Sequence, residues 1–347
     1  MIISYFIIHF LQTASIYFTV LLGLFLSCNI VIKMPIIHHA GILPVLIMLL
    51  LPVMTLFALP LASSMAVYIT VAEHKERDEL VIISFLSKAM QALRYSVVLY
   101  AFLCSVVYAI FAFYLAPQGY VLSKRLFFNV AKDQFLQVEP GVFHSTIPAV
   151  SFYVQAKKLT ADKQTLFEKL ILVLRKKNSE QLFIAADSGF FDERQLVLHN
   201  GHIVSYKNEQ VHTAFFKKTA IQIDAYIAPP QEKKLVMQSR FLTVNMLWAH
   251  TSDDYEMSFE LHKRIVQTGW QFVLILLAFA YALIRKKSSL LSCVLMCGMT
   301  FLASYLMISL AQGYTQHGLL CLGLLYGPLV VAFISSVIII LKRRNRV

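Results

Sequence analysis

Nucleotide hydrolysis and hydrolytic catalysis each need a recognisable pattern of side chains, and this sequence lacks those patterns. None of its 12 glycines is followed by Lys-Ser or Lys-Thr, so the phosphate-binding loop of a P-loop ATPase cannot form. The H-E-x-x-H and G-x-S-x-G patterns of zinc proteases and serine hydrolases are also absent. All five cysteines lie within apolar runs, where a thiol commonly packs as a small hydrophobic group. We therefore expect no catalytic site, no metal site and no cofactor bound by this chain.

Outside one central region, the acidic residues gather in a single segment that we call the acidic island, Glu73-His74-Lys75-Glu76-Arg77-Asp78-Glu79-Leu80. It separates two long apolar runs, and every other acidic residue lies between Asp133 and Glu260. A transport protein without a nucleotide site needs a partner that supplies the work. We interpret the acidic island as the place where such a partner acts.

Composition indicates an integral membrane protein. Hydrophobic residues make up 58% of the 347 and charged residues only 14%, whereas a soluble domain carries about 25% charged residues. The net charge of +12 does not predict a nucleic-acid partner, because outside the central region the basic residues form short clusters beside apolar runs.

Six apolar runs are each long enough to cross a bilayer. Three precede and three follow a polar region, which gives the domains 1–116, 117–260 and 261–347. The runs extend over about 3–32, 41–71, 95–116, 266–284, 290–311 and 318–341. Lys and Arg cluster in alternate loops, so the positive-inside rule places both termini and the acidic island in the cytoplasm and residues 117–260 outside. The second run contains Pro44, Pro52 and Pro60, which predict a flexing helix, although prolines are also generally common in membrane helices.

The polar region 117–260 reads as β structure, because short strand-like pieces alternate with turn signals. Asn200-Gly201 between two apolar pieces is the strongest hairpin signal in the chain, and Asp187-Ser188-Gly189 also predicts a turn. The fold class is therefore a membrane α-helical bundle of six transmembrane helices with an inserted all-β domain.

Five motifs lie in order along almost the whole chain: Leu59-Pro60-Leu61, Arg77-Asp78-Glu79-Leu80-Val81, Glu139-Pro140-Gly141-Val142-Phe143, the run 183–189 with 196–201, and Glu260-Leu261-His262-Lys263-Arg264-Ile265. Together with the three-plus-three layout, they resemble the LptF/LptG (YjgP/YjgQ) family of permease subunits of the lipopolysaccharide exporter. The last motif slightly favours LptF, although Glu79-Leu80-Val81 is closer to LptG.

This resemblance implies an ATP-binding cassette exporter in the bacterial inner membrane. Two related permeases would pair as an LptF–LptG heterodimer above an LptB-type ATPase dimer, which would hold the ATP and Mg²⁺. Lipopolysaccharide would be extracted from the inner membrane, pass through a periplasmic β-jellyroll formed by residues 117–260, and move on to LptC/LptA-type jellyroll bridge proteins.

The resemblance also assigns candidate residues. Glu79 would engage the ATPase from a cytoplasmic coupling helix at about 76–90. The alternative is a purely local capping role, because the helix dipole favours an acid at the start of a helix. Its neighbours in that contact would be Asp78, Arg77, Leu80, Ile83 and Phe85.

For the lipid, the inward-facing candidates are Leu182, Ile184, Leu196, Leu198 and Ile203, with an ordinary closed core as the alternative. Lys33, Lys263 and Arg264 would lie near lipid phosphates at the outer surface, with plain interfacial anchoring as the alternative. A different class of function also stays open, namely a non-transporting membrane scaffold whose β-domain binds other envelope proteins.

Overall fold

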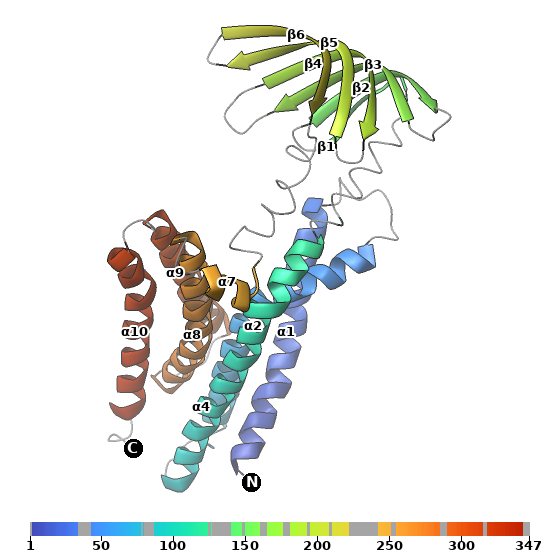
Figure 1. The fold of residues 1–347 in the computed structure, drawn as a ribbon. Helices are drawn as coiled ribbons and strands as arrows, with labels where there is room; N and C mark the ends of the chain where they lie inside the picture. Colours follow the sequence, from blue (N-terminus) through green and yellow to red (C-terminus); the bar gives the residue numbers. More distant parts are fainter. Residues whose placement is uncertain are drawn as a thin grey trace. The chain divides into compact units, whose positions relative to one another are not determined.

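The computed structural model describes residues 2–33, 43–77, 79, 87–123, 126, 140–147, 150–159, 165–175, 181–192, 195–207, 210–221, 242–250, 255–284, 290–314 and 318–342. The chain divides into two compact units. A mainly helical unit comprises Met1–Asn29, Ile47–Tyr120 and Ser239–Val347, and a second unit with the sheet comprises Ile30–Leu46 and Val121–Gln238 (Figure 1). The expected domain limits at 116 and 260 stay predictions, while these units divide after Tyr120 and Gln238.

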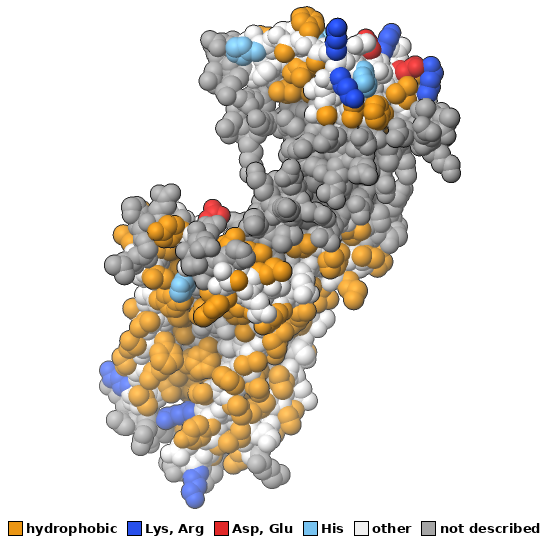
Figure 2. Space-filling model, in the orientation of Figure 1, with side chains coloured by type: hydrophobic (Ala, Val, Ile, Leu, Met, Phe, Trp, Pro, Cys, Tyr) orange, Lys and Arg blue, Asp and Glu red, His pale blue; other side chains and the backbone are white. Residues whose placement is uncertain are grey.

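Among the described residues, six helices are long and apolar enough to cross a membrane, as the hydropathy pattern predicts. Such lengths match the thickness of a bilayer, and the helical form satisfies every backbone polar group where no water is present. The helices are α1 (Ile2–Lys33), α2 (Leu43–Glu76), α4 (Ser87–Ile110) continued by η3 (Phe111–Leu115), α8 (Tyr255–Ile284), α9 (Leu290–Gly313) and α10 (Gly318–Lys342). On the face shown in Figure 2, hydrophobic side chains cover most of the helical unit, as a lipid-exposed surface requires.

Helix α8 is the centre of the helical unit. It packs against α4, α9 and α10, and side chains along its whole length are buried. A short helix, α7 (Val244–His250), lies against the N-terminal part of α8, where Leu247 packs on Met257 and Leu261.

Helix α2 runs without interruption through two of its three prolines. Pro52 and Pro60 lie inside the helix, whereas Pro44 is in its first turn, where a proline removes no internal hydrogen bond. Below Pro60, the hydroxyls of Ser63 and Ser64 both donate to the Pro60 carbonyl oxygen, at 3.2 and 2.7 Å. Such back-bonding often bends a helix. Pro60 therefore combines two features that favour bending, and its role as a hinge stays a prediction.

The inserted domain contains a six-stranded antiparallel sheet in the sequential order β1 to β6. Its strands are β1 (Phe143–Ile147), β2 (Val150–Leu159), β3 (Thr165–Arg175), β4 (Gln181–Asp192), β5 (Gln195–Lys207) and β6 (Gln210–Ile221). The predicted fold class, six membrane helices with an inserted all-β domain, is confirmed.

A transverse row of five positions crosses the sheet, and we call it the crease. The strand pairing skips each of these positions, and all five side chains are exposed. Two of them, Lys169 and Asn200, have positive φ angles of 47° and 48°. The row consists of Gln155, Lys169, Asp187, Asn200 and Lys217.

The crease interrupts the alternation of side chains along the strands. Ile184 pairs with Ile203, while Leu198 pairs with Gly189, so an uninterrupted strand would place Leu198 on the face opposite to Ile203. Leu198 and Ile203 nevertheless belong to the same apolar cluster. The left-handed Asn200 between them restores both to one face.

Two predicted turns are wrong. Asn200-Gly201 lies in the middle of β5, and Asp187-Ser188-Gly189 lies inside β4. Asn200 does take the left-handed conformation that an Asn-Gly hairpin would use, but it uses it to form the crease. Gly201 is required by close packing, because an added Cβ would lie 2.3 Å from the Ala185 carbonyl oxygen.

Candidate functional site

Glu79, the residue expected to meet a partner, contacts its own chain through His74. The Glu79 Oε2 atom lies 3.7 Å from His74 Nε2, and 45% of the Glu79 side chain is exposed. His74 Nδ1 lies 2.8 Å from the Thr70 carbonyl oxygen, which can only accept, so the proton belongs on Nδ1. The contact with Glu79 is therefore a full ion pair only when the His74 ring carries two protons.

Aromatic side chains from the beginning of α1 pack against His74. The His74 ring lies 5.4 Å from Phe6 and 5.7 Å from His9, measured between ring centroids, and His74 is buried. This packing fixes the position of His74, and with it one side of Glu79. The other side of Glu79 is accessible to a partner.

Lys75 connects the acidic island to the central helix. Its Nζ atom donates to the carbonyl oxygens of Ala282 and Leu283, at 3.3 and 3.2 Å, in the last turn of α8. Carbonyl groups at a helix C-terminus lack intrahelical partners and carry partial negative charge, so a cation stabilises them. Lys75 thus caps α8 from the end of α2.

Of the remaining residues expected to meet the ATPase, the structure describes only Arg77. Arg77 is exposed directly after α2. Since α2 ends at Glu76 and α4 begins at Ser87, both ends of the expected coupling helix at 76–90 belong to membrane helices. The remaining expected contacts lie outside the described residues: Asp78, Leu80, Ile83 and Phe85.

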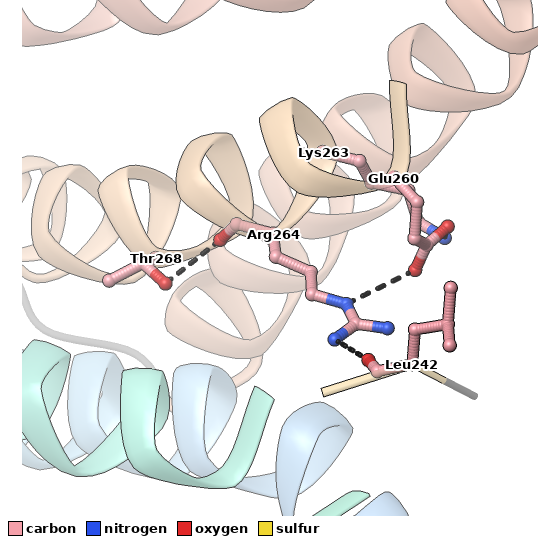
Figure 3. Close-up of polar contacts among 5 residues, drawn as sticks. All are labelled: Leu242, Glu260, Lys263, Arg264 and Thr268. Atoms are coloured by element: carbon pink, nitrogen blue, oxygen red, sulfur yellow. Dashed lines mark hydrogen bonds and ion pairs between the residues drawn. The ribbon is translucent and has the colours of Figure 1, made fainter. Parts of the chain in front are cut away.

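At the opposite end of α8, a buried ionic cluster holds the segment that leads from the sheet into the helices. Arg264 Nε donates to Glu260 Oε1 at 3.3 Å, and Arg264 Nη1 donates to the Leu242 carbonyl oxygen at 2.8 Å (Figure 3). Lys263 Nζ donates to the other Glu260 oxygen at 2.9 Å. Only 4% of Arg264 is exposed. Its guanidinium would have to leave these partners before it could contact a lipid phosphate.

Lys263, one of the two lysines expected near lipid phosphates, is less buried than Arg264. Of its side chain, 21% is exposed. Lys33 is the last residue of α1. A lipid contact for either lysine stays a prediction.

The five apolar candidates in the sheet all belong to one apolar cluster on one face. Ile184, Leu196 and Leu198 are almost fully buried within it, whereas Leu182 and Ile203 are half-buried and pack against it. The cluster therefore has an accessible margin at Leu182 and Ile203 and a closed interior at the other three. The remaining buried members are Phe152, Val154, Phe167, Leu170, Leu172 and Ala186.

A comparison with known protein families matches residues 3–343 to the family described as "Lipopolysaccharide export system permease LptF/LptG". The chain belongs to the LptF/LptG family. Members of this family are permease subunits of an ABC transporter that work with other components of lipopolysaccharide export, and they are not enzymes themselves. The match covers the family as a whole, so the preference for LptF stays a prediction. No curated protein matches the chain.

Two residues of this LptF/LptG chain were missed by sequence reasoning. Gln271, which is fully buried in α8, donates through Nε2 to the Ser63 hydroxyl oxygen of α2 at 2.8 Å. Lys75, also on α2, donates to carbonyl oxygens in the last turn of α8. Neither contact has a local sequence signal, because the residues that it joins are more than 200 positions apart. Within the described part of the chain, no group of three or more His, Cys, Asp or Glu residues could hold a metal ion.

Proposed function

We propose that this chain is the transmembrane subunit through which an inner-membrane ABC exporter extracts lipopolysaccharide and passes it through the inserted β-domain. The family match over residues 3–343 carries this proposal. The six apolar helices and the one-sided apolar cluster of the sheet support it, because a lipid with several acyl chains needs a continuous apolar path through water.

In this proposal both termini and the acidic island face the cytoplasm, and residues 117–260 face the periplasm. The distribution of Lys and Arg between alternate loops supports this orientation. The partners are a paralogous permease in an LptF–LptG heterodimer, an LptB-type ATPase dimer that binds the ATP and Mg²⁺, and an LptC/LptA-type bridge. Glu79 contributes to the ATPase contact through its exposed side.

Photo-crosslinking from the sheet to lipopolysaccharide tests the path. A photoreactive residue at Ile203, on the accessible margin of the apolar cluster, is expected to crosslink to lipopolysaccharide in cells. The matched control is Phe183, which is 41% exposed and adjoins Leu182 and Ile184 but alternates to the opposite face of β4. Equal crosslinking at both positions, or at neither in a folded protein, would contradict a lipid path along the apolar face.

Glu79→Lys tests the motor and separates transport from a scaffold role. The expected result is loss of ATPase co-purification together with loss of surface lipopolysaccharide. The control is Glu76→Lys, which changes an exposed acid three residues away at the end of α2. A scaffold that only binds envelope proteins would co-purify with no ATPase subunit even as wild type, and Glu79→Lys would leave surface lipopolysaccharide intact.

A further inference from the structure

The charged groups at the two ends of α8 define how deeply this helix lies in the membrane. Lys75 caps it at Ala282 and Leu283, and the ionic cluster with Arg264 lies toward the other end. From Arg264 to Leu283 the helix rises about 28 Å, at roughly 1.5 Å per residue. That rise matches the hydrocarbon core of a bilayer, which is about 30 Å thick. Between these ends, α8 contains no Asp, Glu, Lys or Arg.

Helix α7 lies just beyond the Arg264 end of this interval. It packs through Leu247 and Val244 onto Leu261 and Met257, which lie one to two turns past Arg264 on α8. One to two turns correspond to about 5–10 Å, which overlaps the headgroup region of about 5–7.5 Å on one side of a bilayer. The hydrogen bond from Arg264 to the Leu242 carbonyl oxygen fixes the segment that leads into α7 at this level.

Two apolar side chains, one on each side of the packed Leu247, are exposed on α7. Leu247 is fully buried, while Met246 is 49% exposed and Trp248 is 70% exposed. Tyr255, at the first position of α8, is 73% exposed. Trp and Tyr are enriched at the boundary between headgroups and acyl chains, where an apolar ring with a polar edge is best accommodated. The other tryptophan, Trp270, is buried in the helical unit.

We propose that α7 is an interfacial helix whose Trp248 inserts into the lipid surface of the leaflet at the Arg264 end of α8. Its partner is the headgroup–acyl boundary of the bilayer. The depth set by α8, the exposed aromatic side chain and the packing of Leu247 onto α8 together favour lipid over water. The inference needs only that the chain spans a membrane, so it does not depend on the proposed transport path.

The chain contains two tryptophans, so Trp270→Phe leaves Trp248 as the only one. The full-length variant is reconstituted in phosphatidylcholine nanodiscs, and its tryptophan fluorescence is measured with brominated phosphatidylcholines. Bromines near the headgroup end of the acyl chain are expected to quench Trp248 by a factor of about 2, and more strongly than bromines near the methyl end, as an interfacial position requires. The matched control is Trp248→Phe, in which the buried Trp270 should respond weakly to both lipids.

Three outcomes would overturn the proposal. Trp248 could be quenched by iodide in water and by neither lipid, which would place it in solvent. It could be quenched most by the deep bromines, which would place it in the hydrocarbon core. It could respond to no quencher, which would mean that protein covers it. If Trp270→Phe fails to fold, the same comparison is made between the wild-type protein and Trp248→Phe, and Trp248 is obtained from the difference.

Discussion

The Nζ atom of Lys75 lies 3.2 Å from the carbonyl oxygen of Leu283, so the acidic island and the central helix α8 are joined by a direct hydrogen bond. Glu79 and Lys75 are only four residues apart along the chain. Under the proposed function, an ATPase that contacts Glu79 acts close to the point where α2 holds α8. The same α8 carries Arg264 and its contact with Leu242 at the other end.

Lys75→Met is expected to lower stability by about 0.3–1 kcal/mol, because the cation at the C-terminus of α8 is lost. Under the proposed function, the variant complex should still assemble and hydrolyse ATP but release less lipopolysaccharide per ATP. Thermal unfolding in detergent and lipid release from proteoliposomes measure the two effects. Lys75→Arg should restore both. Lys88→Met removes an exposed cation at the start of α4 and serves as the control. A parallel loss in both methionine variants would argue against the cap.

Arg264→Met is expected to destabilise the protein by about 3 kcal/mol, because the change removes one partner of a buried ion pair. It also leaves the Leu242 carbonyl oxygen without this donor. Lys263→Met removes the more exposed cation that contacts the same carboxylate, so its cost should be no more than about 1 kcal/mol. Thermal unfolding in detergent compares the two variants. Similar losses in both would mean that burial of Arg264 does not determine its contribution.

Gly201→Ala is expected to destabilise the protein by about 1–3 kcal/mol, since forced overpacking shifts the neighbouring backbone. The new Cβ would meet the Ala185 carbonyl oxygen at 2.3 Å and the Phe216 ring at 2.5 Å. Gly189→Ala, in the adjacent strand, is the control because its closest contact is the Leu198 side chain at 2.8 Å, which can move. Chemical denaturation followed by circular dichroism gives both values. A smaller loss at Gly201 than at Gly189 would contradict this interpretation.

Pro60→Ala tests the hinge in α2. Alanine restores a backbone N–H inside the helix, so stability should be kept or increased while lipid export falls. Pro44→Ala is the control, because Pro44 lies in the first turn and removes no internal hydrogen bond. The measurements are the melting temperature and surface lipopolysaccharide in cells. Normal export by Pro60→Ala would exclude a hinge at this position.

Hydropathy predicted the six membrane helices well, because a span needs a long apolar run and few other structures use one. The predicted run 290–311, for example, corresponds to α9 at Leu290–Gly313. The β character of the insertion was also predictable from its alternating strands and turn residues. The positions of the turns were harder to predict from the sequence. Asn200-Gly201 has the chemistry of a hairpin, but the same left-handed backbone also serves a crease inside a strand.

The acidic island was found because acids are rare in the apolar part of the chain, and its role as a partner contact stays a prediction. Of the Glu79 side chain, 45% is exposed. The contact of Lys75 with α8 could not be predicted, since nothing in the sequence near Lys75 differs from an ordinary positive-inside cluster. Burial of Arg264 was missed for a related reason. A basic residue near the end of a span predicts a surface position unless its tertiary partners are known.

Phe113, near the end of the third span, packs with Leu242 and Leu247, where the chain returns from the inserted domain. The end of the third span and the segment that enters α7 are therefore neighbours within the helical unit. In terms of modular architecture, both ends of the stretch that carries the sheet are anchored at one place in the helices. Chimeras joined between Phe113 and Leu242 therefore offer a way to exchange the β-domain while the packing of the membrane helices is kept.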